Sequence, residues 1–126
     1  MKILILIVED EDILSRVLKD KFESDGFQVE LVTEGNIVID AIKKFSPDFI
    51  LLDILLPRKN GLDILKELKS DPKLKKIPVM IISNLFDSKS MKDAKDLGAI
   101  EYMVKTEHPI NEVVWKVKNY FSTSKN

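Results

Sequence analysis

The chain has 126 residues, of which 44% are hydrophobic and 33% are charged, and this size and composition are typical of one globular domain. The 20 basic and 21 acidic residues leave a net charge of −1, and there is no cysteine. Net charge therefore favours neither nucleic acid nor an anionic membrane as a partner, and disulfides and thiolate metal sites are excluded. No apolar run approaches the ~20 residues of a membrane span or has the form of a signal peptide, so we expect a cytoplasmic protein.

The first half of the chain alternates between strand and helix patterns. Residues 3–8 are a short, continuous apolar run rich in β-branched side chains, which predicts a strand buried on both faces. Apolar residues then recur at helical spacing from Ile13 to Phe22, and Gly26 should end this helix because glycine tolerates positive φ. A second strand is predicted over residues 27–32 and a second helix over residues 35–45.

The second half repeats this alternation three more times. Prolines and glycines separate the units, as is typical of turns. Strands are predicted over residues 49–52, 79–82 and 100–104, and each is followed by a helix, over residues 62–71, 88–97 and 110–121. Residues 122–126 are interpreted as a short flexible tail.

Five strand–helix units in succession predict one α/β domain over residues 1–121. Parallel strands need crossover connections, and right-handed crossovers place helices on both faces of the sheet. The expected fold is a doubly wound parallel sheet of five strands. In such sheets ligands bind beyond the carboxyl ends of the strands, so residues at those ends are the candidates for function.

Polar side chains gather at this predicted edge. Glu9 and Asp10 follow the first strand, Asp53 the third, Ser83 the fourth and Lys105 the fifth. Two like charges ~4 Å apart repel by about 4 kcal/mol at an effective dielectric of 20, so a cluster of carboxylates favours a bound cation. Because the candidate ligands are oxygens, with no histidine or cysteine among them, a hard ion such as Mg²⁺ fits best.

Four features together resemble the bacterial response-regulator receiver domain of two-component systems. They are the stretch Ile-Leu-Ile-Val-Glu-Asp-Glu-Asp over residues 5–12, the stretch Asp-Ile-Leu-Leu-Pro-Arg-Lys-Asn-Gly over residues 53–61, Ser83 and Lys105. The resemblance covers nearly the whole chain and includes the order and spacing of these sites. It implies the flavodoxin-like (βα)5 receiver fold, with strand order 2-1-3-4-5, in a stand-alone, single-domain protein.

The resemblance implies a role for each matching acid. Asp53 matches the phosphoacceptor, whose carboxylate attacks a phosphohistidine and becomes an acyl phosphate. Asp10 and Asp53 match direct magnesium ligands, and Glu9 matches an acid that usually binds the ion through water. The backbone carbonyl of Leu55 matches the third protein ligand. Mn²⁺ is an alternative ion for the same site.

Three further residues match the parts that respond to the phosphoryl group. Ser83 matches the switch hydroxyl that bonds a phosphoryl oxygen, Lys105 the lysine that pairs with the phosphoryl group, and Tyr102 the switch aromatic on the fifth strand. Mg²⁺ and Lys105 would supply positive charge where the transferring group spreads negative charge. Phosphorylation is then expected to reshape the face made by the fourth helix, fifth strand and fifth helix.

Several residues at this edge also have a simpler structural interpretation. Glu11 and Asp12 are interpreted as acids at the start of a helix. Ser83 could instead cap the fourth helix, and Tyr102 could be a half-buried packing residue. Trp115 falls off the apolar stripe of the last helix, and we interpret it as cover for the edge of the core rather than as an interface anchor.

Two positions depart from the pattern of the family. Thr106 stands where the family usually has a proline joined by a cis peptide bond. A non-proline cis bond costs ~2.5–4 kcal/mol, so the Lys105–Thr106 bond is either strained or trans. Asn84 stands where the family often has a small residue, and its larger side chain would narrow access to the phosphoryl group and slow its hydrolysis.

The predicted function is that of a phosphoprotein in a phosphorelay, and not of an enzyme beyond its own phosphorylation and dephosphorylation. Its phosphate would come from a histidine kinase or phosphotransfer protein, and it would control a downstream protein as a monomer or a weak, phosphorylation-dependent homodimer. We expect no nucleic acid or membrane partner. Two alternatives stay open. One is a small aspartyl-nucleophile phosphatase that uses Asp10-Glu11-Asp12. The other is a degenerate receiver that binds partners without phosphate.

Overall fold

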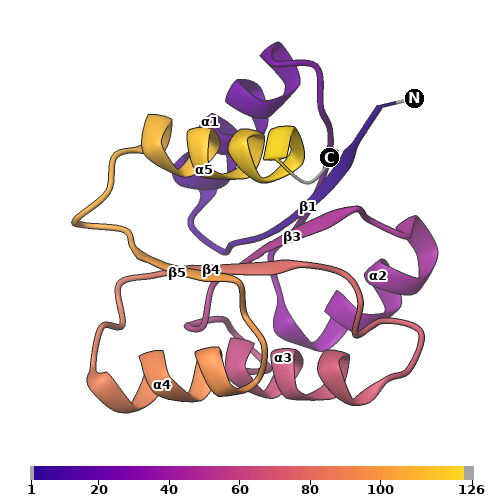
Figure 1. The fold of residues 1–126 in the computed structure, drawn as a ribbon, viewed down its shortest axis with the longest axis vertical. Coiled ribbons are helices and arrows are strands. Elements are labelled where there is room, and N and C mark those ends of the chain that lie inside the picture. Colours follow the sequence, from indigo (N-terminus) through magenta and orange to yellow (C-terminus); the bar gives the residue numbers. More distant parts are fainter. Residues whose placement is uncertain (1, 124–126) are drawn as a thin grey trace.

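A computed structural model describes residues 2–123, and its strands form one five-stranded parallel sheet in the order β2-β1-β3-β4-β5. This confirms the predicted doubly wound fold and its strand order. Helices α1 and α5 cover one face of the sheet, and α2, α3 and α4 cover the other (Figure 1). The elements in chain order are β1 (Leu4–Val8), α1 (Asp12–Ser24), β2 (Gln28–Val32), the 3₁₀ turn η1 (Gly35–Ile37), α2 (Val38–Phe45), β3 (Phe49–Leu52), α3 (Gly61–Ser70), β4 (Val79–Ser83), α4 (Ser88–Asp96), β5 (Glu101–Val104) and α5 (Ile110–Thr123).

The sheet divides the core into two layers. Successive side chains of a strand point to opposite faces. In β1, Leu6 and Val8 pack toward α2, α3 and α4, whereas Ile5 and Ile7 pack toward α1 and α5. All four are fully buried, which is why this strand is apolar without alternation. No helix within residues 2–123 is both long enough and apolar enough to cross a membrane.

Some boundaries differ from the sequence predictions for identifiable reasons. The second strand begins at Gln28 rather than Phe27, because the N–H of Phe27 donates to the carbonyl of Phe22 at 3.0 Å and so closes the end of α1. The predicted helix over 35–45 opens as a 3₁₀ turn. Helix α5 continues to Thr123, two residues into the expected tail over 122–126, and residues 124–126 lie outside the described residues.

Candidate functional site

The predicted acid cluster forms where β1 and β3 end side by side. The N–H of Glu9 donates to the carbonyl of Val32 and the N–H of Asp53 donates to that of Val8, both at 3.0 Å, so sheet-like pairing continues one residue beyond each strand. Glu9 and Asp53 are buried, with 0% and 2% of their surface exposed, whereas Asp10 is exposed. One carboxylate oxygen from each of the three acids lies within 4.8 Å of the others. This is the geometry of a small cation site with oxygen ligands.

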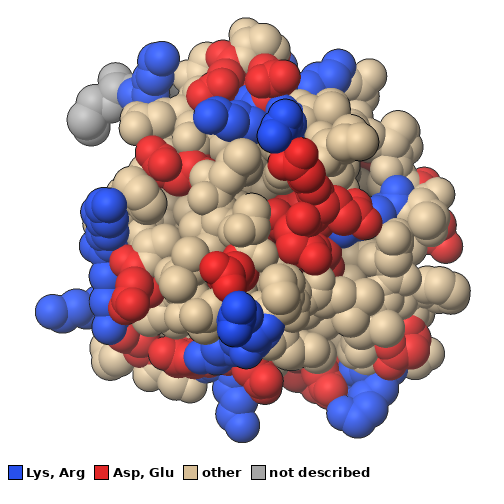
Figure 2. Space-filling model, turned by 180° about the vertical axis from the view of Figure 1, so that it is seen from behind, with Lys and Arg blue, Asp and Glu red and all other residues tan. Residues whose placement is uncertain are grey.

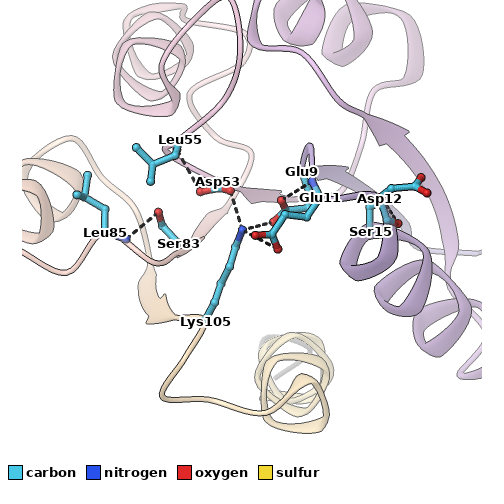
Figure 3. Close-up of polar contacts among 9 residues, drawn as sticks. All are labelled: Glu9, Glu11, Asp12, Ser15, Asp53, Leu55, Ser83, Leu85 and Lys105. Atoms are coloured by element: carbon cyan, nitrogen blue, oxygen red, sulfur yellow. Dashed lines mark hydrogen bonds and ion pairs between the residues drawn. The ribbon is translucent and has the colours of Figure 1, made fainter.

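Lys105 extends from the end of β5 into this cluster, at the edge of the sheet where the sequence placed it. Its Nζ lies 2.8 Å from Oδ2 of Asp53 and 2.7 Å from Oε1 of Glu9, and Figure 3 shows the side chain reaching between the two acids. There is no cis peptide bond within residues 2–123, so the Lys105–Thr106 bond is trans. Of the two alternatives that the sequence left open, the structure therefore has the trans bond, and Lys105 still reaches Asp53.

Burial and ion pairing act in opposite directions on the charged groups of the cluster. Burial, with a contribution from the charge of Asp53, raises the pKa of Glu9 from 4.5 to about 7, although Lys105 and the N–H of Glu11 act in the opposite direction. Burial alone would lower the pKa of Lys105, but the hydrogen bond to Asp53 and the ion pair with Glu9 outweigh burial and raise it. Lys105 is therefore a firmly charged cation, and Glu9 is an acid that a second cation would help to ionise.

The charge distribution over the surface agrees with a local negative site. On the face shown in Figure 2, the largest group of acidic side chains lies to the right of the centre, with smaller acidic groups elsewhere and many Lys and Arg side chains toward the rim. The net charge of −1 therefore hides a region of concentrated negative charge, and such a region attracts cations.

The loop after β3 holds the Asp53 carboxylate from the side opposite Lys105. The N–H of Leu55 donates to Oδ1 of Asp53 at 3.1 Å, while Oδ2 accepts from Lys105. Gly61 closes the loop by donating its N–H to the carbonyl of Ile54 at 2.8 Å. A Cβ at Gly61 would lie 2.2 Å from the carbonyl oxygen of Asp53, so only glycine fits there. Asp53 is thus fixed in orientation by groups on both sides.

Ser83 lies at the end of β4, on the far side of Asp53 from Glu9 (Figure 3). It is fully buried, and its Oγ accepts a hydrogen bond from the N–H of Leu85 at 3.2 Å. Its alternative interpretation as the cap of α4 is wrong, because Asp87 caps that helix by accepting from the N–H of Ser90 at 2.9 Å.

Two further candidate residues, Tyr102 and Asn84, differ in their contacts. Tyr102 is half-buried, and its hydroxyl donates to the carbonyl of Leu85. It thus makes a specific polar contact as well as packing against the core. Asn84 is exposed, and its effect on phosphate hydrolysis stays a prediction.

Sequence reasoning missed the contribution of Glu11 to the site. Glu11 stands at the start of α1, but its side chain caps no helix N–H, and its Oε2 lies 3.6 Å from Nζ of Lys105. Asp12 does behave as predicted, since it belongs to the first turn of α1 and pairs with Arg16 on the surface at 3.2 Å. Within a run of four acids, residue type alone does not indicate which carboxylate turns toward the lysine.

Trp115 does not cover the edge of the core, so that interpretation was wrong. Its side chain is 58% exposed. It lines a groove of about 330 Å³ between α1 and α5 whose other lining residues are Lys21, Ser24, Asp25, Asn111, Val114 and Lys118.

The family model described as the response regulator receiver domain matches residues 5–115. This span includes every residue of the acid cluster, together with Ser83 and Lys105. The chain belongs to the response-regulator receiver family. It is therefore the receiver domain of a two-component response regulator, the part that accepts the phosphoryl group.

Two curated relatives illustrate the settings in which similar receivers occur. The receiver is 28% identical over 116 residues to the polar-differentiation response regulator DivK of Brucella ovis, and the match covers 92% of this chain and 94% of DivK. It is 28% identical over 114 residues to the DNA-binding response regulator MtrA of Mycolicibacterium smegmatis, with 90% of this chain and 48% of MtrA covered. The receiver thus spans about half the length of MtrA and nearly all of DivK.

Solved structures resemble the receiver over most of its length. The signal receiver domain of a signal transduction histidine kinase from Syntrophus aciditrophicus is 30% identical, with a TM-score of 0.86 and 98% of this chain and 92% of that chain covered. The Mn²⁺-bound form of response regulator Rcp1 is 26% identical, with a TM-score of 0.76 and coverages of 81% and 80%.

Proposed function

We propose that the receiver takes its phosphoryl group on Asp53, with Mg²⁺ held by Glu9, Asp10, Asp53 and the backbone carbonyl of Leu55. The observation that carries this proposal is the meeting of three acids, with oxygens within 4.8 Å of one another, and Lys105 at 2.8 Å from Asp53. This arrangement supplies a nucleophile, ligands for a cation and a fixed positive charge at one place.

The residues of the cluster fit a divalent cation. All the donors are oxygens, which suits Mg²⁺ or Mn²⁺, and the similar structure of Rcp1 is a Mn²⁺-bound form. Glu9 is buried, and burial raises its pKa, so a cation beside it would stabilise its charged form. When bound, Mg²⁺ offsets the negative charge of a phosphoryl group in transfer.

The chain's own residues orient the reaction. The N–H of Leu55 and Nζ of Lys105 bind the two oxygens of Asp53 and hold the carboxylate in one orientation. One of these oxygens attacks the phosphorus of a phosphohistidine. The new O–P bond forms as the P–N bond breaks, and the imidazole nitrogen keeps the electron pair. Lys105 and the hydroxyl of Ser83 then bind phosphoryl oxygens. No general base is needed, because the carboxylate is already the nucleophile.

The donor would be a histidine kinase or a phosphotransfer protein. The conformational change on phosphorylation would pass from Ser83, through the loop that follows it and Tyr102, to the face made by α4, β5 and α5. A downstream protein or a second receiver would bind to this face. Apart from its own phosphorylation and dephosphorylation the receiver would catalyse nothing. The hydrogen bond between Tyr102 and Leu85 supports this route, because it joins β5 to the loop after Ser83.

The test is incubation with acetyl phosphate and Mg²⁺, followed by intact mass measurement. Wild type and Asp12→Asn should each gain one phosphate, because Asp12 pairs with Arg16 outside the cluster, and Asp53→Asn should gain none. An adduct that survives in Asp53→Asn would place the nucleophile on another residue. The absence of an adduct on wild type, together with no change in its NMR spectrum on adding beryllofluoride, would overturn the proposal.

The phosphatase alternative is less well supported by the geometry. It requires Asp10 and Asp12 to act together, yet Asp12 turns outward to Arg16, with about three quarters of both side chains exposed. Steady turnover of a simple phosphoester would favour that alternative. The degenerate receiver is also less well supported, since the three acids meet, Lys105 contacts Asp53, and Ser83 ends the strand next to β3.

A further inference from the structure

The loop after β2 and the loop after β3 touch at a point that leaves no room for a side chain. The N–H of Gly35 donates to the carbonyl of Pro57 at 3.0 Å. A Cβ added to Gly35 would lie 2.0 Å from the carbonyl oxygen of Lys59, whereas real Cβ contacts essentially never fall below 3.0 Å. Any other residue at position 35 would therefore push the two loops apart.

An ion pair fastens the same two loops from the solvent side. Oε2 of Glu34 lies 2.9 Å from Nε of Arg58, and both side chains are partly exposed. Arg58 has a φ of 75°, a left-handed conformation that is unfavourable for residues other than glycine. Such a conformation persists only where its surroundings hold it. Glu34 pairs with the Arg58 side chain, and Gly35 lies against the residues before and after Arg58, Pro57 and Lys59.

The loop after β3, which these contacts of Glu34 and Gly35 hold in place, leads directly to the candidate metal site. We call these contacts the brace. Leu55 lies two residues before Pro57, and its N–H donates to the carboxylate of Asp53 at 3.1 Å. At the other end of the loop, Gly61 donates to the carbonyl of Ile54 at 2.8 Å. Because so short a loop is tied at both ends, a shift at Pro57 must be taken up by Leu55 and Asp53.

We propose that Glu34 and Gly35 are positioning residues, which set the carbonyl of Leu55 and the carboxylate of Asp53 for the metal ion. This role rests on the proposed metal site. Neither residue touches the acid cluster, so they act through Arg58 and Pro57. Through the brace, the loop after β2 would help to position the residues that bind the metal ion, although that loop carries no metal ligand itself.

The first test is Gly35→Ala, with Mg²⁺ affinity measured by NMR titration. Outer-shell changes typically weaken metal affinity about 10–100-fold, and we expect a loss of about tenfold or more. The amide signals of Ile54 and Leu55 should also move in the metal-free protein. Gly26→Ala is the matched control. Its methyl group meets nothing within 4 Å, although its φ of 93° strains alanine in a way that position 35 does not, so Mg²⁺ affinity should not change.

The second test separates bracing from simple charge. Glu34→Gln and Arg58→Gln each break the ion pair at an exposed position, so both variants should fold even where Gly35→Ala does not. Bracing predicts that both weaken Mg²⁺ binding, by about two- to fivefold, as expected for an exposed pair. A purely electrostatic effect predicts opposite changes in Mg²⁺ affinity. Glu34→Gln, which removes a negative charge, would weaken binding, and Arg58→Gln, which removes a positive charge, would strengthen it.

The outcomes distinguish the brace from the metal site. If wild type binds Mg²⁺ and the two glutamine variants bind it equally well, or with opposite shifts, the brace is overturned and the metal site stands. If wild type binds no Mg²⁺ at all, the proposed metal site is overturned, and the role of the brace toward the metal falls with it.

Discussion

The hydroxyl of Tyr102 on β5 donates a hydrogen bond to the backbone carbonyl of Leu85, two residues beyond Ser83. Burial, with smaller contributions from Asp87 and Asp53, raises the pKa of Tyr102 to about 12, so the hydroxyl keeps its proton at neutral pH and remains a donor. The N–H of Leu85 in turn donates to Oγ of Ser83 at 3.2 Å. Leu85 is therefore bonded to Ser83 on one side and to Tyr102 on the other, so a movement of Ser83 toward a phosphoryl group should be passed through Leu85 to Tyr102.

Tyr102→Phe should loosen this connection while keeping the ring in place. The carbonyl of Leu85 would lose its donor, and a lost hydrogen bond of this kind costs about 1 kcal/mol of unfolding free energy. Amides 84–87 should exchange with solvent faster, which NMR hydrogen exchange would measure. Unchanged exchange at these amides would mean that the hydroxyl does not hold the loop.

Lys105→Met should destabilise the metal-free protein strongly. The side chains of Lys105, Glu9 and Asp53 are only 12%, 0% and 3% exposed, and removing one partner of a buried ion pair costs about 3–5 kcal/mol. Added Mg²⁺ should recover part of the loss, because it would replace the missing positive charge. Urea denaturation with and without Mg²⁺ measures both effects.

The control for this prediction is Lys89→Met, which breaks the exposed ion pair with Asp93 on α4. It should leave the free energy of unfolding almost unchanged in either buffer. Equal stability of Lys105→Met and wild type would contradict the electrostatic role assigned to Lys105.

The stability of the metal-free protein should depend on the protonation of Glu9. Its pKa is raised from 4.5 to about 7 in the folded state, so the folded protein binds this proton more tightly than the unfolded chain. The resulting stabilisation is complete below pH 4.5 and is lost as the pH rises through about 7. Relative to Glu9→Gln, the unfolding free energy of wild type should fall by up to about 1.4 kcal/mol per pH unit in this window. Urea titrations in EDTA would measure it, and parallel pH profiles would contradict it.

Asn60→Ala should weaken the start of α3. The side-chain oxygen of Asn60 accepts a hydrogen bond from the N–H of Leu62 at 2.7 Å, and loss of such a cap costs about 1 kcal/mol. Chemical denaturation should show this loss, and Asn36→Ala, at an exposed position in η1, serves as the control. A cost no larger than that of the control would mean that solvent satisfies the helix end equally well.

The fold and the acid cluster were predictable because each depends on local pattern and simple topology. The apolar run over residues 3–8 indicated a fully buried strand, and Ile5 to Val8 are indeed 0% exposed. Once the strands are parallel, their carboxyl ends must share an edge. The receiver resemblance further implied that the first and third strands are neighbours, as they are in the structure, so Glu9 and Asp53 were expected to meet.

The remaining features depend on how separate segments pack. Gly35 fell within a helical pattern, and nothing in that pattern indicates that the backbone of Lys59 would approach it. Glu11 and Asp12 are neighbours of the same type, and only the exact start of α1 turns Glu11 toward Lys105. The sequence allowed either a cis or a trans bond between Lys105 and Thr106, and only the path of the folded backbone shows that it is trans.

The groove at Trp115 has a consequence for spectroscopy. Trp115 is the single tryptophan of the chain, and its indole lies largely in solvent between α1 and α5 rather than beside Asp53. Its emission should therefore already be red-shifted in the native protein and change little on unfolding. A change in its emission on phosphorylation would report that α1 and α5 have moved relative to each other, and would not be a direct signal of chemistry at the acid cluster.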